Sequence, residues 1–128
     1  MRVLLVDDDT VANMVHRRAI KKTGLAEHID AVDDGAAALD YLKSMHEADR
    51  PDVILLDINM PGMNGFEFLE VYATLPEHQQ ARGVVIMLTT SLMAAERAQA
   101  EANPFVHAFL DKPLASERFS EIARQLSV

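Results

Sequence analysis

Short apolar runs alternate along this chain with longer stretches that have helical periodicity. Every residue is apolar in the runs 3–6, 53–56 and 84–88. Such strands are typical of a parallel sheet that helices cover on both faces. A weaker strand pattern at 28–32 alternates like an edge strand, and a mixed run at 105–110 completes a set of about five.

The first helix is expected between the first two strands. Thr10 is the predicted N-cap, and Gly24 the residue that ends the helix after Lys21 and Lys22. Helical spacing predicts that its buried face contains the apolar residues Val11, Met14, Val15 and Ala19.

Stripes at helical spacing also follow the other strands. They indicate helices around 38–45, 66–73 and 119–126. Ser91 is the expected N-cap of an alanine-rich helix that ends near Ala102 and has few large apolar anchors. The repeated β-α order predicts an α/β fold with a doubly wound parallel sheet. A single domain is expected over 1–128, because a barrel needs more units than this length supplies.

Composition excludes several classes of protein. The formal net charge of −8 argues against non-specific binding to nucleic acid. The absence of cysteine excludes disulfides and thiolate chemistry. No apolar run approaches the roughly 20 residues of a membrane span, and the first residues do not form a signal peptide. We therefore expect a cytoplasmic protein with no membrane partner.

Reactive side chains follow the apolar runs. Asp7 and Asp8 follow the run 3–6, Asp57 follows 53–56 and Thr89 follows 84–88. Lys112 comes shortly after the run 105–110. The carboxyl ends of parallel strands meet at one edge of a sheet, where open α/β folds bind ligands. Clustered carboxylates without histidine or cysteine favour Mg²⁺. A carboxylate beside such a cation can attack phosphorus and form an aspartyl phosphate. We assign this role to Asp57.

The histidines and methionines have simpler interpretations. His16, His28, His46, His78 and His107 show no ligand spacing and are interpreted as surface or partly buried residues. Met14, Met45 and Met87 are interpreted as core filling.

Four segments together resemble the receiver domains of two-component response regulators: VDD at 6–8, LDINMPGMNG at 56–65, LTT at 88–90 and KP at 112–113. The resemblance covers nearly the whole chain. It implies a flavodoxin-like fold with strand order 2-1-3-4-5. It also implies that Asp57 is the phosphoacceptor, that Thr89 and Lys112 contact the phosphoryl group, and that the Lys112-Pro113 peptide is cis.

The resemblance also implies a metal site and a switch. Mg²⁺ is expected to bind Asp8, Asp57 and the backbone carbonyl of Asn59, with Asp7 acting mainly through metal-bound water. Phosphorylation is expected to draw Thr89 inward and to shift Phe109, although Phe109 also fits a plain core position. The implied phosphoryl donor is a sensor histidine kinase, a histidine phosphotransfer protein or a small acyl phosphate.

Three functions stay open at this point. The first is a stand-alone, chemotaxis-regulator-like receiver that controls a downstream effector protein in trans, or passes its phosphoryl group to a histidine phosphotransfer protein. Such a protein, a monomer or weak dimer, catalyses only its own phosphorylation and autodephosphorylation. The second is a Mg²⁺-dependent phosphatase with an aspartyl-phosphate intermediate, although Asn59 stands where such enzymes usually have an acid. The third is a receiver-like scaffold that does not accept phosphate. For a receiver, we expect the fourth helix, fifth strand and fifth helix to form the partner surface.

Overall fold

Five parallel strands form one sheet in the computed structural model, which describes residues 1–90 and 93–126. The strand order is β2-β1-β3-β4-β5, which confirms the predicted order and the α/β class. The strands are β1 Arg2–Val6, β2 His28–Val32, β3 Val53–Asp57, β4 Val84–Thr89 and β5 Val106–Asp111. The α-helices are α1 Thr10–Thr23, α2 Gly35–Ser44, α3 Gly65–Tyr72, α4 Ala94–Ala102 and α5 Ser116–Leu126.

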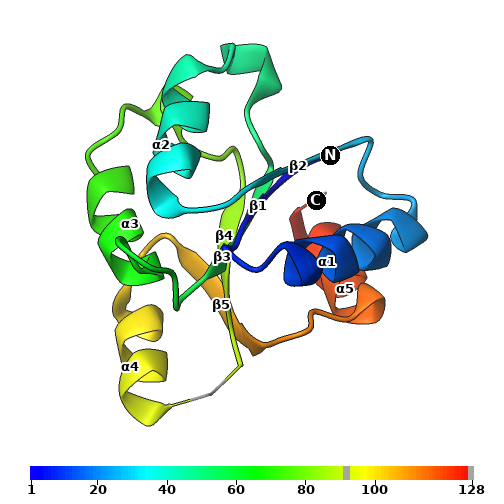
Figure 1. Ribbon diagram of the computed structural model, residues 1–128. Coiled ribbons are helices and arrows are strands. Elements are labelled where there is room, and N and C mark those ends of the chain that lie inside the picture. The colour runs from blue at the N-terminus through cyan, green and yellow to red at the C-terminus, as the bar shows by residue number, and fades with distance from the viewer. Residues whose placement is uncertain (91–92, 127–128) are drawn as a thin grey trace.

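Helices cover both faces of the sheet, with α1 and α5 on one face and α2, α3 and α4 on the other (Figure 1). The central strand β3 is buried at all five positions because it has a neighbour on each side and helices on each face. Alternate β3 residues enter the two cores, since successive side chains of a strand point to opposite faces. Ile54 and Leu56 pack under α2 and α3, whereas Val53 and Leu55 pack under α1 and α5.

The start of α1 differs from the prediction by one residue. Asp9, not Thr10, is the N-cap, and its Oδ1 accepts hydrogen bonds from the backbone N–H groups of Val11 at 2.9 Å and Ala12 at 3.3 Å. Thr10 is the first helical residue. An aspartate at this position both satisfies free N–H groups and complements the helix dipole. The end of α1 is as predicted, with Gly24 in the left-handed conformation at φ 72°.

The predicted buried face of α1 is wrong for three of its four residues, and the fourth, Ala19, is partly buried. Val11, Met14 and Val15 are 63%, 55% and 43% exposed, so Met14 does not fill the core. The buried residues of α1 are Asn13, His16 and Ile20. These three also have helical spacing, and two of them are polar because this part of α1 faces the carboxyl edge of the sheet. Asn13 and His16 both have backbone hydrogen-bond partners there.

The remaining elements follow the sequence patterns closely. Helix α5 buries Phe119, Ile122 and Ala123, whereas α4 buries only Ala100 among its residues and ends before Asn103, as expected. Ser91, the expected N-cap of α4, lies outside the described residues. Over the ranges 1–90 and 93–126, none of the helices combines the length and apolar character that crossing a membrane requires.

Candidate functional site: an acidic pocket at the carboxyl edge of the sheet

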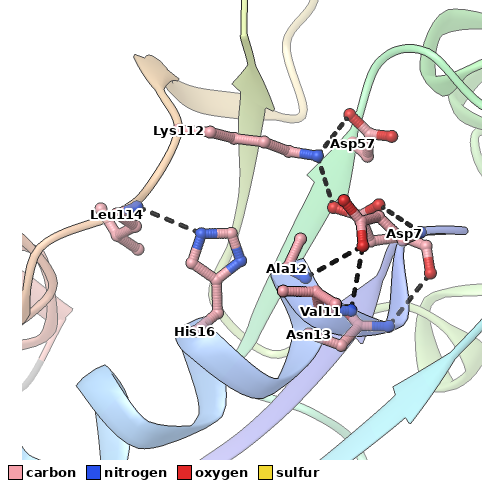
Figure 2. A network of polar contacts seen from close by, with 9 residues as sticks. Asp7, Val11, Ala12, Asn13, His16, Asp57, Lys112 and Leu114 are labelled. Atoms are coloured by element: carbon pink, nitrogen blue, oxygen red, sulfur yellow. Dashed lines mark hydrogen bonds and ion pairs between the residues drawn. The ribbon is translucent and has the colours of Figure 1, made fainter.

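The predicted site residues lie together at the carboxyl edge of the sheet. Asp7 follows β1, Asp57 ends β3, Thr89 ends β4 and Lys112 follows β5. Figure 2 shows Asp7, Asp57 and the Lys112 side chain converging from three different strands. The parallel sheet thus brings together residues that are up to 105 positions apart in sequence.

The start of α3 approaches the end of β3 closely, next to Asp57. The backbone N–H of Gly65 donates to the carbonyl of Ile58 at 2.8 Å. A Cβ atom on Gly65 would lie 2.8 Å from the backbone carbonyl oxygen of Asp57, which is too close for backbone that cannot move. Glycine at position 65 therefore allows the start of α3 to approach the end of β3.

Asp7, Asp8 and Asp57 form a cluster of carboxylates. One oxygen of each lies within 4.8 Å of the others, with Asp7 and Asp57 buried and Asp8 exposed. Three hard oxygen donors, one of them facing solvent, suit Mg²⁺, which retains several water ligands. The residues therefore fit the ion that the sequence predicts, and a bound divalent cation would offset the repulsion among these carboxylates.

Lys112 pairs with two of these carboxylates. Its Nζ donates to Asp7 Oδ2 at 2.5 Å and lies 3.0 Å from Asp57 Oδ1. Burial disfavours the ammonium form, but the hydrogen bonds to Asp7 and Asp57 outweigh it and raise the pKa of Lys112. The pocket thus contains a fixed positive charge directly beside the candidate phosphoacceptor.

Asp57 has an unusually high pKa for an aspartate. Burial, together with the nearby charges of Asp7 and Asp8, raises the pKa of Asp57 to about 6, although Lys112 opposes the shift. A carboxyl with this pKa is not fully ionised in slightly acidic solution. A cation that binds between the carboxylates would favour the ionised, nucleophilic form.

Thr89 and Lys112 are also joined through the backbone. Thr89 is completely buried at the end of β4. Its backbone carbonyl accepts a hydrogen bond from the backbone N–H of Lys112 at 2.8 Å. The Lys112-Pro113 peptide is cis, which confirms the expectation. Asn59 is exposed two residues beyond the end of β3, on the loop that leaves the pocket.

Phe109 lies in the core and not at the surface. Its side chain is 6% exposed, within the cluster beneath α2, α3 and α4. The guanidinium carbon of Arg97 on α4 lies 5.4 Å from the centre of its ring. An exposed cation therefore covers the outer side of the aromatic residue expected to switch.

Sequence reasoning missed two buried residues beside the pocket. His16, interpreted as a surface or partly buried residue, is 3% exposed, and Asn13 is 7% exposed. Figure 2 shows both on α1, below the acidic cluster. The other four histidines are exposed, as predicted. The spacing of Asn13, His16 and Ile20 could have revealed this face, but the competing apolar stripe gave a stronger signal.

This chain is similar in sequence and structure to proteins of one known family. The family model of the response regulator receiver domain matches residues 3–124. The chain belongs to the receiver domain family of two-component signalling. A two-component response regulator of Cytophaga hutchinsonii is 32% identical with a TM-score of 0.90, covering 98% of this chain and 96% of that one.

Two further similar proteins agree with the assignment of this chain to the receiver domain family. A response regulator receiver protein of Dyadobacter fermentans is 35% identical with a TM-score of 0.88, over 99% of this chain and 98% of that one. The probable methanogenesis regulatory protein FilR2 of Methanothrix harundinacea is 32% identical over 97% of this chain and 79% of its own length. The receiver spans only about half the length of several other curated relatives.

Membership of the family carries general properties. Receiver domains are phosphoacceptor modules of two-component signalling that interact with histidine kinases and downstream effectors, and they generally bind Mg²⁺ at an acidic pocket. In this receiver, Asp7, Asp8 and Asp57 form the corresponding cluster of acidic side chains.

Proposed function

We propose that this receiver accepts a phosphoryl group on Asp57 and thereby controls the binding of a partner protein in trans. The observation that carries the proposal is the convergence on one pocket of Asp57, two further carboxylates and the Lys112 ammonium. Buried like charges are costly unless an opposite charge offsets them. Phosphoryl transfer relies mainly on positioning and charge neutralisation, which this pocket supplies.

The transfer balances as a simple displacement. A carboxylate oxygen of Asp57 attacks phosphorus of a phosphohistidine, forming an O–P bond while the N–P bond to the imidazole breaks, and the departing nitrogen keeps the bonding electrons. With acetyl phosphate as the donor, the leaving group is acetate. Mg²⁺ bound by Asp8, Asp57 and the Asn59 carbonyl, with Asp7 acting through bound water, would neutralise charge on the phosphoryl oxygens.

Lys112 and Thr89 then contact the transferred group. The Lys112 Nζ already lies 3.0 Å from Asp57 Oδ1, so an ion pair with a phosphoryl oxygen needs little movement. Thr89 ends the neighbouring strand, and its hydroxyl donates to a second phosphoryl oxygen. Water attacking the aspartyl phosphate later returns Asp57 and inorganic phosphate.

The same contacts provide the output. When the Thr89 hydroxyl turns toward the phosphoryl group, the packing around Phe109 on the next strand changes. Phosphorylation thus shifts the equilibrium from the unphosphorylated toward the phosphorylated conformation. Arg97 covers Phe109 from α4, so a change at Phe109 reaches the surface of α4, β5 and α5. This surface is the proposed site for the effector protein.

Acetyl phosphate with Mg²⁺ tests the assignment. Intact-mass measurement should show one added phosphoryl group on the wild-type chain and none on Asp57→Asn. Asp9→Asn is the matched control, because Asp9 is an exposed carboxylate that caps α1 outside the cluster, and it should label normally. Label on Asp57→Asn at the wild-type level would overturn the proposal, and sustained turnover of a phosphomonoester would favour the phosphatase instead.

A further inference from the structure

We infer that His16 is a positioning residue that holds the Lys112 backbone, and thereby the Lys112 ammonium, in place to receive the phosphoryl group. The inference rests on the proposed function and deepens it. It assigns a role in the phosphoryl site to α1, a helix that contributes no side chain to the carboxylate cluster.

Two hydrogen bonds bracket the Lys112-Pro113 peptide. On one side, the Lys112 N–H donates to the Thr89 carbonyl at 2.8 Å. On the other side, the Leu114 N–H donates to His16 Nε2 at 3.2 Å, across 98 positions of sequence. Pro113 has no N–H group, so Leu114 supplies the first backbone donor after that of Lys112. His16 therefore holds the first backbone donor that follows Lys112 in the chain.

The geometry defines the chemical form of His16. Because a backbone N–H donates to Nε2, that nitrogen has no proton, and the neutral ring has its proton on Nδ1. Burial, with help from the positive charge of Lys112, lowers the pKa of His16, which is consistent with a neutral ring. A neutral acceptor holds the loop without placing a second cation beside the phosphoryl site.

Asn13 supports the other partner of Lys112. Its Nδ2 donates to the backbone carbonyl of Asp7 at 3.0 Å, and the Asp7 carboxylate accepts from Lys112. Asn13 lies three residues before His16 on the same buried face of α1. As Figure 2 shows, α1 thus contacts both the end of β1 and the loop after β5, which carry the two members of one ion pair.

This arrangement explains the composition of α1. A buried polar group without a partner is costly. Asn13 Nδ2 and His16 Nε2 have backbone partners, whereas Asn13 Oδ1 is buried without a hydrogen bond from the residues that the structure describes. Asn13 and His16 occupy the buried face, while Val11, Met14 and Val15 lie outside. Apolar packing alone would have favoured the opposite orientation of the helix.

Loss of the His16 acceptor should affect the phosphoryl group more than the metal ion. The carboxylates that would bind Mg²⁺ are anchored on β1 and β3, whereas Lys112 depends on the loop after β5. A looser loop would leave Mg²⁺ affinity nearly unchanged and weaken the contact between Lys112 and an anion on Asp57.

Beryllofluoride, which mimics a phosphoryl group on aspartate, provides the test. Wild type, His16→Leu and His16→Gln are titrated first with Mg²⁺ and then with beryllofluoride at saturating Mg²⁺. Leucine keeps an apolar side chain but removes the acceptor, whereas glutamine keeps an acceptor oxygen. We expect His16→Leu to weaken beryllofluoride binding by roughly three- to tenfold, the usual effect of one lost hydrogen bond. Mg²⁺ affinity should change less than about twofold, and His16→Gln should restore most of the loss.

Several results would overturn the inference. They are equal beryllofluoride affinity in His16→Leu and wild type, a parallel loss of Mg²⁺ affinity, or no rescue by glutamine. Met14→Ala, at an exposed position of the same helix, is the control for helix effects. Absence of Asp57-dependent beryllofluoride binding by the wild type would instead refute the proposed function.

A measurement on the unmodified protein covers the case in which a variant does not fold. Nitrogen-15 NMR of the wild-type imidazole should show His16 protonated on Nδ1 and not on Nε2, and the Leu114 amide should exchange slowly with solvent. A proton on Nε2, or fast exchange of Leu114, would contradict the inference without any substitution.

Discussion

Helices α1 and α5 pack on the same face of the sheet, yet they bury different chemistry. Helix α5 buries Phe119, Ile122 and Ala123, the stripe that its sequence predicts. Helix α1 exposes its most obvious apolar stripe and buries Asn13 and His16. The difference follows from position, because these two residues of α1 meet the carboxyl edge of the sheet, where the backbone of Asp7 and Leu114 offers hydrogen bonds. Apolar periodicity predicts burial against a core and fails beside a polar site.

The largest expected effect is at α5. Phe119 is 1% exposed and contributes to the core beneath α1 and α5. Phe119→Ala should lower the free energy of unfolding by about 3–5 kcal/mol, because it removes buried contacts and leaves a cavity. Urea denaturation of the metal-free protein measures the change. A loss below about 1 kcal/mol would show that α5 is not the firmly packed helix of the pair.

A substitution in the carboxylate cluster should raise the free energy of unfolding instead of lowering it. Asp57→Asn removes a buried charge whose pKa is raised to about 6 and should stabilise the metal-free protein at pH 7 by about 1–2 kcal/mol. Below its folded pKa, Asp57 retains its proton and the cost of ionisation disappears. The gain should therefore be complete above pH 6 and shrink as the pH falls toward the ordinary value of 3.8.

Urea denaturation of both proteins from pH 4 to pH 8 checks this dependence, since titrating groups that do not interact with Asp57 cancel in the difference. A gain that is constant with pH, or a loss of stability at pH 7, would contradict the assigned ionisation of Asp57. Saturating Mg²⁺ should reverse the order of stability, because the ion favours the protein that retains all three carboxylates.

Removal of the cation above Phe109 should have a smaller effect. Arg97→Ala should destabilise the protein by about 0.5–1 kcal/mol, because the Arg97 side chain is half-exposed and its contact with the ring is partly solvated. Arg97→Lys is the matched variant, since it keeps the charge but loses the flat guanidinium. Thermal unfolding gives the values, and a stability change above about 2 kcal/mol would mean that Arg97 has a structural role beyond this contact.

The smallest effect is expected on the exposed stripe of α1. Met14→Gln should change the free energy of unfolding by less than about 0.5 kcal/mol, because Met14 is 55% exposed. The same urea experiment, run beside Phe119→Ala, measures the contrast between the two helices. A loss of 2 kcal/mol or more would show that the stripe is buried and would remove the difference on which the comparison rests.

The apolar runs predicted the α/β fold and the convergence of the site residues, whereas the strand order came from the resemblance to receiver domains. Strands that are apolar throughout specify a parallel sheet, and this topology brings Asp7, Asp57 and Lys112 to one edge. The burial of Asn13 and His16 in α1, in place of its apolar stripe, could not be predicted from such patterns. It depends on hydrogen bonds from Asn13 and to His16 that exist only once distant backbone groups have been brought together. The N-cap at Asp9 was missed by one residue because Asp9 and Thr10 are both good caps.

The position of the phosphoryl group on the chain is the most direct test of the proposed role of Asp57. Borohydride reduction after treatment with a phosphoryl donor and Mg²⁺ converts an aspartyl phosphate to homoserine, which peptide sequencing by mass spectrometry then locates. We expect homoserine at position 57 and at no other aspartate. Homoserine at position 7, 8 or 9, or an unmodified Asp57 in protein that carries label, would contradict it.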